Sequence, residues 1–250
     1  DRVVLEPGRI ARLTLAAPAS RNAISRAMWI ALARIADRIE ADESIRVVIL
    51  SGEGETFSAG ADITEFEEVY ANQETTDAYN ALVREASRKL RQLRCPVLAE
   101  IRGSCVGGGC GLALAADLRF AAANARFGIT PSRLGIAYSP ADTLQLMEKV
   151  GPARAKDILF SARLVPAAEA LSMGLIDRVH EATELAEAVA SYAEGLAALS
   201  PASLRTTKRI VNSLTPAVAS TEENAFRALF SGPDFAEGRA AFLAKRKPSF

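Results

Sequence analysis

The chain contains 250 residues, of which 49% are hydrophobic, and its 30 basic side chains balance 30 acidic ones. This length and composition suffice to bury the core of one large domain. Because the formal net charge is zero, the protein as a whole does not attract nucleic acid electrostatically. No apolar run reaches membrane-spanning length. We therefore expect neither nucleic acid nor a membrane as a partner, and an anionic ligand would have to be held by local groups.

The cysteines and the single histidine exclude two common kinds of site. Cys95, Cys105 and Cys110 form no CxxC pair, and His180 is the one histidine. This set provides neither a disulfide framework nor a common zinc-binding arrangement. We expect no metal site, a reducing cytoplasmic location, and His180 at the surface at the end of a strand.

The first elements are a hairpin, a helix and a strand. Val3–Leu5 and the alternating Ile10–Leu15 flank the turn Glu6-Pro7-Gly8-Arg9, which predicts a β-hairpin. Ser25 then predicts a helix cap. The apolar residues that follow recur at helical spacing: Met28, Leu32, Ile35, Ala36 and Ile39. Residues 46–50 are continuously apolar after Arg46, which predicts a buried strand.

The middle of the chain alternates helices with buried strands. Residues 65–94 begin polar and become amphipathic, which predicts a mobile loop leading into a helix. A second buried strand is predicted at 96–101, a helix at 112–116 and a third strand at 118–121. The repeated order of buried strand, glycine loop and helix indicates an α/β fold.

The remaining residues are predicted to be mostly helical around one short strand at 175–179. Helix breaks are predicted at Gly151-Pro152, Val165-Pro166 and Met173-Gly174. From Glu184 onward only helices are predicted, with starts at Pro201 and Pro216 and an interruption at Gly232-Pro233.

Two of the predicted buried strands are followed by glycine turns. Residues 57–62 carry Gly60, and residues 107–109 are three consecutive glycines. If the strands are parallel neighbours, the turns meet, and two backbone amides beside a helix N-terminus form an oxyanion hole for a thioester or enolate oxygen. The alternative is that the glycines only let a helix pack closely on a sheet. Two nucleotide motifs fail. Leu112 stands where the dinucleotide pattern needs glycine, and Gly109 and Cys110 stand where the phosphate loop needs lysine followed by serine or threonine.

Six stretches in order resemble the crotonase, or enoyl-CoA hydratase/isomerase, superfamily over nearly the whole chain. They are PASRNA at 18–23, FSAGADI at 57–63, VGGGCGLALAAD at 106–117, ARFGITPSRLG at 125–135, GLIDRV at 174–179 and AFLAKRKPSF at 241–250. The resemblance implies a spiral of ββα units over residues 1–195 and a helical region at 196–250 for assembly as a homotrimer or a dimer of trimers. It also implies an acyl-CoA substrate, with coenzyme A carried as part of that substrate and no separate cofactor.

The resemblance also assigns site residues. It implies an oxyanion hole made by the amides of Ala61 and Gly108. The residues that would contact the substrate or its CoA portion are Arg21, Ala23, Ala59, Asp62, Ile63, Gly107, Thr130, Pro131, Leu134 and Lys245. The alternative is a solvated surface position for Arg21 and the terminal basic cluster, and a helix cap for Asp62.

The two glutamates that hydratases of this family use are missing. The resemblance places them at positions where this chain has Gly111 and Pro131. Hydration of an α,β double bond needs one group to activate water and another to donate a proton at Cα, and neither glycine nor proline titrates. The ordinary hydratase mechanism is therefore not expected.

Tyr138 is the candidate proton donor. Residues 129–138 are similar to the methylmalonyl-CoA decarboxylase branch, which has a tyrosine at this place, although that branch has a histidine where this chain has Ala61. Decarboxylation chiefly needs stabilisation of an enolate. Tyr138 could instead be a packing residue.

Two acidic side chains remain to be explained. Asp142 is interpreted as the start of a helix rather than as a reactive carboxylate. Glu100 lies inside an apolar strand, where an ion pair with Arg102 or Arg119 is the expected explanation.

The main hypothesis is an acyl-CoA enzyme of the hydratase/isomerase family that stabilises a thioester enolate, with Tyr138 near the reacting atoms. A decarboxylase, an isomerase and a C–C lyase remain open, as does a non-catalytic acyl-CoA-binding scaffold that has lost both acids.

Overall fold

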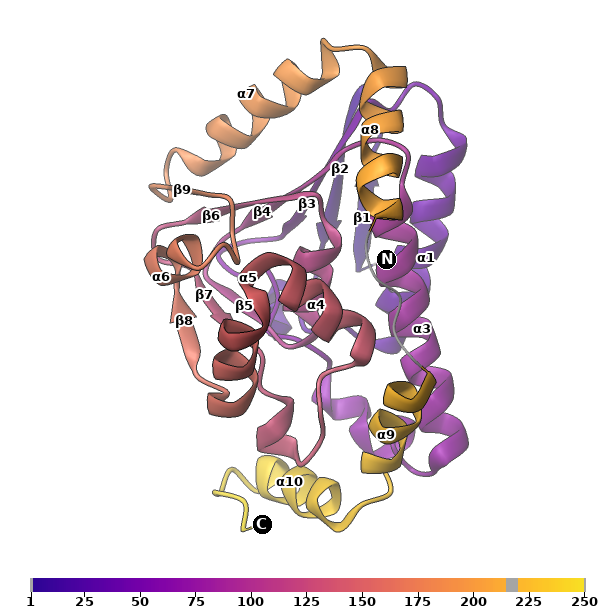
Figure 1. The fold of residues 1–250 in the computed structure, drawn as a ribbon, viewed down its shortest axis with the longest axis vertical. Coiled ribbons are helices and arrows are strands. Elements are labelled where there is room, and N and C mark those ends of the chain that lie inside the picture. Colours follow the sequence, from indigo (N-terminus) through magenta and orange to yellow (C-terminus); the bar gives the residue numbers. More distant parts are fainter. Residues whose placement is uncertain (1, 215–219, 250) are drawn as a thin grey trace.

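The computed structural model describes residues 2–214 and 220–249, and it has an α/β architecture, as expected from the sequence (Figure 1). The main sheet has the strand order β1-β2-β3-β4-β6-β9. Its strands are β1 (Val3–Glu6), β2 (Ile10–Leu15), β3 (Val47–Gly52), β4 (Val97–Ile101), β6 (Leu118–Ala122) and β9 (Arg178–His180). The pair β1–β2 is antiparallel and all later neighbours are parallel.

A smaller sheet lies beside the end of the main one. It has the order β5-β7-β8, with β5 (Ser104–Val106), β7 (Arg126–Gly128) and β8 (Leu164–Pro166). The sequence analysis missed all three strands, because three residues are too few to establish an alternating pattern. It had interpreted Val165-Pro166 only as a helix break.

The helices follow the strands in chain order. The longer ones are α1 (Arg26–Ala41), α3 (Gln73–Gln92), α5 (Pro140–Ser161), α7 (Leu185–Ala197), α8 (Pro201–Ser213), α9 (Ser220–Leu229) and α10 (Pro233–Leu243). The shorter ones are α2 (Phe66–Val69), α4 (Gly108–Ala115), α6 (Ala167–Ser172) and the 3₁₀ turns η1 (Pro18–Ser20), η2 (Ile63–Glu65) and η3 (Pro131–Leu134). No described helix is both long and apolar enough to cross a bilayer.

Helices cover both faces of the main sheet, which explains its continuously apolar strands. Val48 and Leu50 of β3 point into the core under α1, α3 and α4, whereas Val47 and Ile49 point into a second cluster under α7. A parallel strand that is buried on both faces has no solvent-exposed side, so polar and apolar residues do not alternate along it. The hairpin, the Ser25 cap, which accepts a 3.3 Å hydrogen bond from the amide of Met28, and the three central strands are confirmed.

Several element boundaries differ from those expected. The helix predicted at 112–116 begins at Gly108, because the glycines themselves take up helical geometry. The strand predicted at 175–179 is β9, three residues later. Residues 65–94 are helical from Phe66 onward apart from a short break, rather than a loop followed by a helix. α5 continues through the predicted break with a kink at Gly151, and Pro216 lies outside the described residues.

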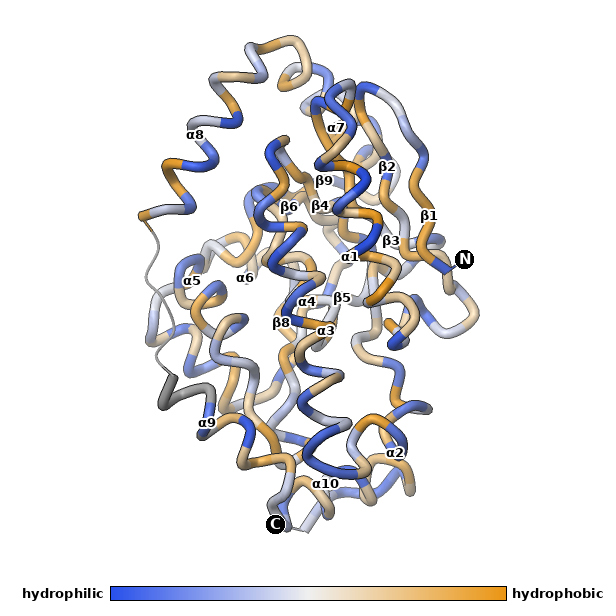
Figure 2. Tube along the Cα trace, turned by 90° about the vertical axis from the view of Figure 1, so that its right-hand side faces the viewer, coloured by the Kyte–Doolittle hydropathy of each residue, from blue (hydrophilic) through white to orange (hydrophobic). Residues whose placement is uncertain are grey.

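The last helices lie apart from the sheet. α8 buries none of its residues and is held by Lys208, whose Nζ lies 2.7 Å from the Asp117 carboxylate and 3.0 Å from the Cys95 carbonyl oxygen. Figure 2 shows α8 at the edge of the molecule, with α9 and α10 towards its other end. α10 packs on η3. The proposed division at residue 195 stays a prediction.

Candidate active site

The two glycine turns meet beyond the carboxyl ends of β3 and β4. Ser58 pairs with Cys105 as a parallel bridge, in which the Ser58 amide donates to Ser104 O and the Val106 amide donates to Ser58 O, each at 3.0 Å. Gly60 and Gly107 have φ angles of 103° and 53°, which favour glycine. A Cβ atom on Gly60 would lie 3.0 Å from the Val106 carbonyl oxygen, so the two turns are in contact.

The amide of Ala61 is turned towards the second loop. Ile24 and Ala61 form a parallel bridge, in which the Ile24 amide donates to Gly60 O at 2.7 Å and the Asp62 amide donates to Ile24 O at 3.0 Å. In this pattern the N–H of Ala61 itself points away from Ile24. Its nitrogen lies 3.8 Å from the position that a Cβ atom of Gly108 would occupy.

The amide of Gly108 lies at the first position of α4. The first amides of a helix have no acceptor inside the helix, and the helix dipole favours negative charge there. Within residues 2–214 and 220–249, neither the Gly108 amide nor the Ala61 amide donates a hydrogen bond to a protein acceptor. Two unpaired donors from separate turns therefore border one space. The ring of Trp29, 3.1 Å from a Cβ atom placed on Gly108, forms its wall.

Tyr138 and Asp142 occupy the space beside Gly111. A Cβ atom on Gly111 would lie 3.2 Å from the Tyr138 hydroxyl and 3.4 Å from Oδ1 of Asp142. Tyr138 is half-buried with its hydroxyl at the inner end, where it donates a 3.4 Å hydrogen bond to the Gly107 carbonyl oxygen. Burial raises the pKa of Tyr138 well above its ordinary value, and the Asp142 charge adds to this shift, so the phenol stays neutral.

Asp142 was expected to start a helix at Thr143, but the helix begins at Pro140, so Asp142 lies within its first turn and its carboxylate faces the site. Ser139 is the N-cap of α5: its hydroxyl accepts from the Asp142 amide at 3.1 Å and donates to Asp142 Oδ2 at 2.6 Å. Only 9% of the residue is exposed, and burial raises its pKa despite the hydrogen bond from Ser139. The sequence analysis assigned the helix start to Asp142 and missed the Ser139 cap, and no local pattern signalled the approach to Gly111.

One further residue predicted to contact the substrate, Pro131, lines a cavity next to Tyr138. This cavity has a volume of about 520 Å³, and Pro131, Ile136, Ala137, Tyr138 and Leu159 are among the residues that line it. Thr130 and Leu134 flank Pro131 at the two ends of η3 without lining this cavity, and Gly107 is the N-cap of α4. The lining is largely apolar, which suits an acyl chain.

The segment predicted to hold the CoA nucleotide is joined to the first glycine turn. The Ala59 amide donates to Arg21 O at 2.9 Å, and the Ser58 hydroxyl donates to Asn22 O at 2.8 Å. The buried Asn22 amide group bonds to Ala17, Glu53 and Thr56, a structural role that the sequence analysis did not assign. Arg21 and Ala23 therefore lie near Ala59 and the following residues, 60–63.

Asp62 lies in the first glycine turn, whereas Lys245 lies near the end of the chain, after α10. Asp62 caps η2, because its Oδ1 accepts from the Thr64 amide at 3.0 Å and the Thr64 hydroxyl at 2.7 Å. Lys245 follows α10, and none of the hydrogen bonds or ion pairs among described residues joins it to Arg21–Ala23 or Ala59–Ile63. Its contact with CoA stays a prediction.

The remaining charged candidates are structural. Glu100 pairs with Arg102 at 3.1 Å and with Arg12 at 3.0 Å, whereas Arg119 bonds to Asp177 at 2.6 Å instead. His180 is not a surface residue as expected: it is half-buried, stacks on Phe120 with ring centroids 6.1 Å apart, and its Nε2 is buried without a partner in the described part of the chain. The described residues contain no group of three or more potential metal ligands.

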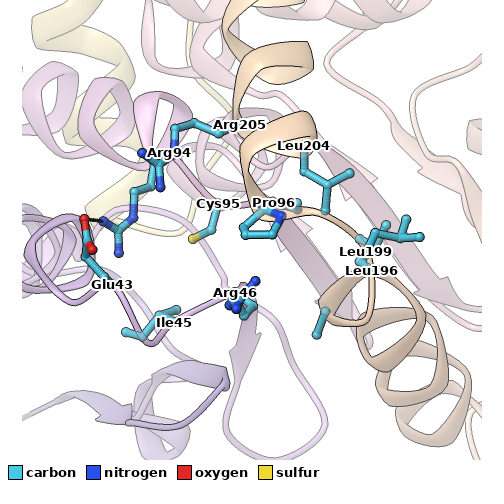
Figure 3. A pocket seen from close by; sticks show the side chains of 12 residues that line it. Glu43, Ile45, Arg46, Arg94, Cys95, Pro96, Leu196, Leu199, Leu204 and Arg205 are labelled. Atoms are coloured by element: carbon cyan, nitrogen blue, oxygen red, sulfur yellow. Dashed lines mark ion pairs between the residues drawn. The ribbon is translucent and has the colours of Figure 1, made fainter.

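A second cavity lies at the opposite ends of the strands. This cavity has a volume of about 220 Å³. Figure 3 shows side chains that line it, among them Arg46, Arg94, Cys95 and Arg205. Arg46 and Pro96 precede β3 and β4, whereas the glycine turns follow these strands. This cavity is therefore separate from the site of the paired amides.

Comparison with known proteins identifies the family of the chain. Residues 6–250 match the family model "Enoyl-CoA hydratase/isomerase". The short-chain-enoyl-CoA hydratase of Clostridium acetobutylicum is 34% identical over 99% of this chain and 96% of its own.

Two solved structures are similar over the whole chain. An enoyl-CoA hydratase/isomerase family protein from Hyphomonas neptunium is 40% identical, with a TM-score of 0.84, and the match covers 100% of this chain and 97% of that one. A methylmalonyl-CoA decarboxylase in complex with 2-nitronate-propionyl-CoA has a TM-score of 0.90 at 26% identity, covering 100% and 98%. The chain belongs to the enoyl-CoA hydratase/isomerase family of the crotonase superfamily.

Proposed function

We propose that the protein binds an acyl-CoA thioester with its carbonyl oxygen between the amides of Ala61 and Gly108 and stabilises the enolate formed from it. The observation that carries this proposal is the pair of amides without protein acceptors, which come from separate turns and border one space. Donors fixed in advance where charge develops favour the enolate over the neutral thioester. Coenzyme A enters as part of the substrate, and no further cofactor is needed for this step.

The side chains around the two amides limit which reaction the site can catalyse. Hydration needs two titratable groups, and Gly111 and Pro131 provide neither. The groups beside Gly111 are instead Tyr138 and Asp142, which come from one segment. A reaction that needs one proton transfer at Cα therefore suits this site better than hydration.

Decarboxylation of a 2-carboxyacyl-CoA is the second, more specific candidate. It is favoured by the position of the Tyr138 hydroxyl beside the glycine turn and by the likeness to the methylmalonyl-CoA decarboxylase structure. Loss of CO₂ leaves the electron pair of the broken C–C bond in the enolate. Only one proton is then required at Cα.

The test is a set of esters incubated with the protein and followed by mass spectrometry. Crotonyl-CoA reports hydration, a 3-enoyl-CoA reports isomerisation, and malonyl-CoA and methylmalonyl-CoA report decarboxylation. We expect turnover of at least one ester, with decarboxylation faster than hydration. Tight binding of all four esters without turnover would instead identify an acyl-CoA-binding scaffold.

A further inference from the structure

We propose that Asp142 is the proton carrier at the substrate Cα, which rests on the proposed function of the paired amides. The geometry that carries this inference is the position of Oδ1, which would lie 3.4 Å from a Cβ atom on Gly111, in the first turn of α4 after the oxyanion amide of Gly108. Because residue 111 is a glycine, there is an open space at this position, and the Asp142 carboxyl group from α5 faces it.

Helix capping alone does not account for this carboxyl group. The hydrogen bonds with Ser139 use the Asp142 amide and Oδ2. Within the described ranges of the chain, Oδ1 accepts no hydrogen bond, although the residue is buried. In the described part of the chain Oδ1 is not fully enclosed either, so the cap leaves it open to a bound molecule, and carboxyl groups whose pKa is raised by burial gather at functional sites.

Tyr138 lies beside this oxygen but cannot act as the base. Burial holds its phenol in the neutral form, and its hydroxyl already donates to the Gly107 carbonyl oxygen. The phenol instead forms part of the boundary of the space beside Gly111, because its hydroxyl would lie 3.2 Å from a Cβ atom on that residue. The proton itself is then carried by Asp142, whose carboxyl pKa is raised by burial towards the working range of a general acid–base group.

The proton transfer balances in both directions. With a saturated acyl-CoA, the Asp142 carboxylate takes a proton from Cα, and the electron pair of that C–H bond becomes the enolate double bond, with the negative oxygen at Ala61 and Gly108. In the decarboxylation direction, the O–H bond of the Asp142 carboxylic acid breaks. Its proton forms the new C–H bond, its electron pair stays on the carboxylate, and solvent restores the proton.

The experiment is exchange of the Cα protons of butyryl-CoA in D₂O, followed by mass spectrometry, with binding of butyryl-CoA measured in parallel. We expect Asp142→Asn, which keeps the shape of the side chain, to lower the exchange rate by about 100-fold or more while binding stays close to that of the wild type. Glu187→Gln removes an exposed first-turn carboxylate from α7 and should leave exchange unchanged.

The pH profile separates proton transfer from a structural effect. Exchange requires the Asp142 carboxylate as a base, so its rate should rise with pH through an ionisation above the ordinary range of aspartate, and Asp142→Asn should lose this dependence. A merely structural residue would change the thermal unfolding midpoint without changing the shape of the profile. If Asp142→Asn fails to fold, Asp142→Ser is measured in its place, with the same expected loss of exchange.

The possible outcomes distinguish this inference from the proposed function. Exchange by Asp142→Asn at the wild-type rate would overturn the role of Asp142 alone and leave the oxyanion hole in place. Binding of butyryl-CoA by the wild type without any exchange would overturn the enolate function, and with it the proton transfer.

Discussion

At the level of single residues, a few atoms determine what this site can do. The pattern of buried strands followed by glycines predicted that two turns meet, and the structure places Ala61 beside Gly108. Asp142 was interpreted only as a helix start, because its approach to Gly111 depends on how α5 packs against α4. Local spacing reveals caps and turns, but contacts between residues 31 positions apart, such as the Tyr138–Gly107 hydrogen bond, depend on tertiary packing.

Gly108→Ala tests the oxyanion hole with one methyl group. The added carbon would lie 3.8 Å from the Ala61 nitrogen and 3.1 Å from the Trp29 ring, in the space assigned to the substrate oxygen. We expect the rate of Cα exchange to fall roughly 100-fold, as for loss of an oxyanion donor. The measurement is butyryl-CoA exchange in D₂O at saturating ester.

Gly195→Ala is the matched control for this substitution. Gly195 lies in α7 with nothing within 4 Å of its Cβ position, so the methyl group should raise the free energy of unfolding by about 0.5–1 kcal/mol without changing exchange. Equal exchange rates in Gly108→Ala and the wild type would show that the oxygen is bound elsewhere.

At the level of elements, η3 and α10 hold the acyl side of the site. A Cβ atom on Gly238 would clash with the Leu134 carbonyl group, and one on Gly135 would clash with the Asp234 carbonyl group. The backbones of these elements therefore touch through glycines. The sequence predicted the start of α10 from Gly232-Pro233, but its docking partner could not be predicted, because a glycine inside a helix carries no sign of what lies against it.

Gly238→Ala should separate α10 from η3. The methyl group cannot be accommodated against backbone atoms, so we expect a loss of about 1–3 kcal/mol in the free energy of unfolding. Hydrogen–deuterium exchange should increase in residues 131–138 and 233–243 and stay unchanged in β3 and β4. Ala236→Ser, at an exposed position of α10, is the control. Unchanged protection of 131–138 would contradict the idea that α10 fixes the acyl side of the site.

At the level of the whole molecule, the sequence predicted the α/β sheet fold and predicts an assembly of several copies. Strands buried on both faces and the glycine turns at their ends point to an α/β core with its site at the carboxyl ends of the strands. The helical region after Glu184 was also predicted. Its exposed apolar side chains, however, do not show by themselves what they contact.

We expect a homotrimer or a dimer of trimers, with a mass of three or six times 26.6 kDa by light scattering. Ile210 of α8 is 52% exposed and Leu214, the residue after α8, is 80% exposed. Because α8 buries none of its residues, neighbouring copies would be the source of its missing packing. Ile210→Arg should shift the population towards monomer, because a charge in an apolar contact is costly. Ile30→Arg changes an exposed apolar residue of α1, away from α8 in Figure 2, and should leave the mass unchanged. A monomeric wild-type protein at micromolar concentration would contradict the expected assembly and would make α8 a surface helix of a single chain.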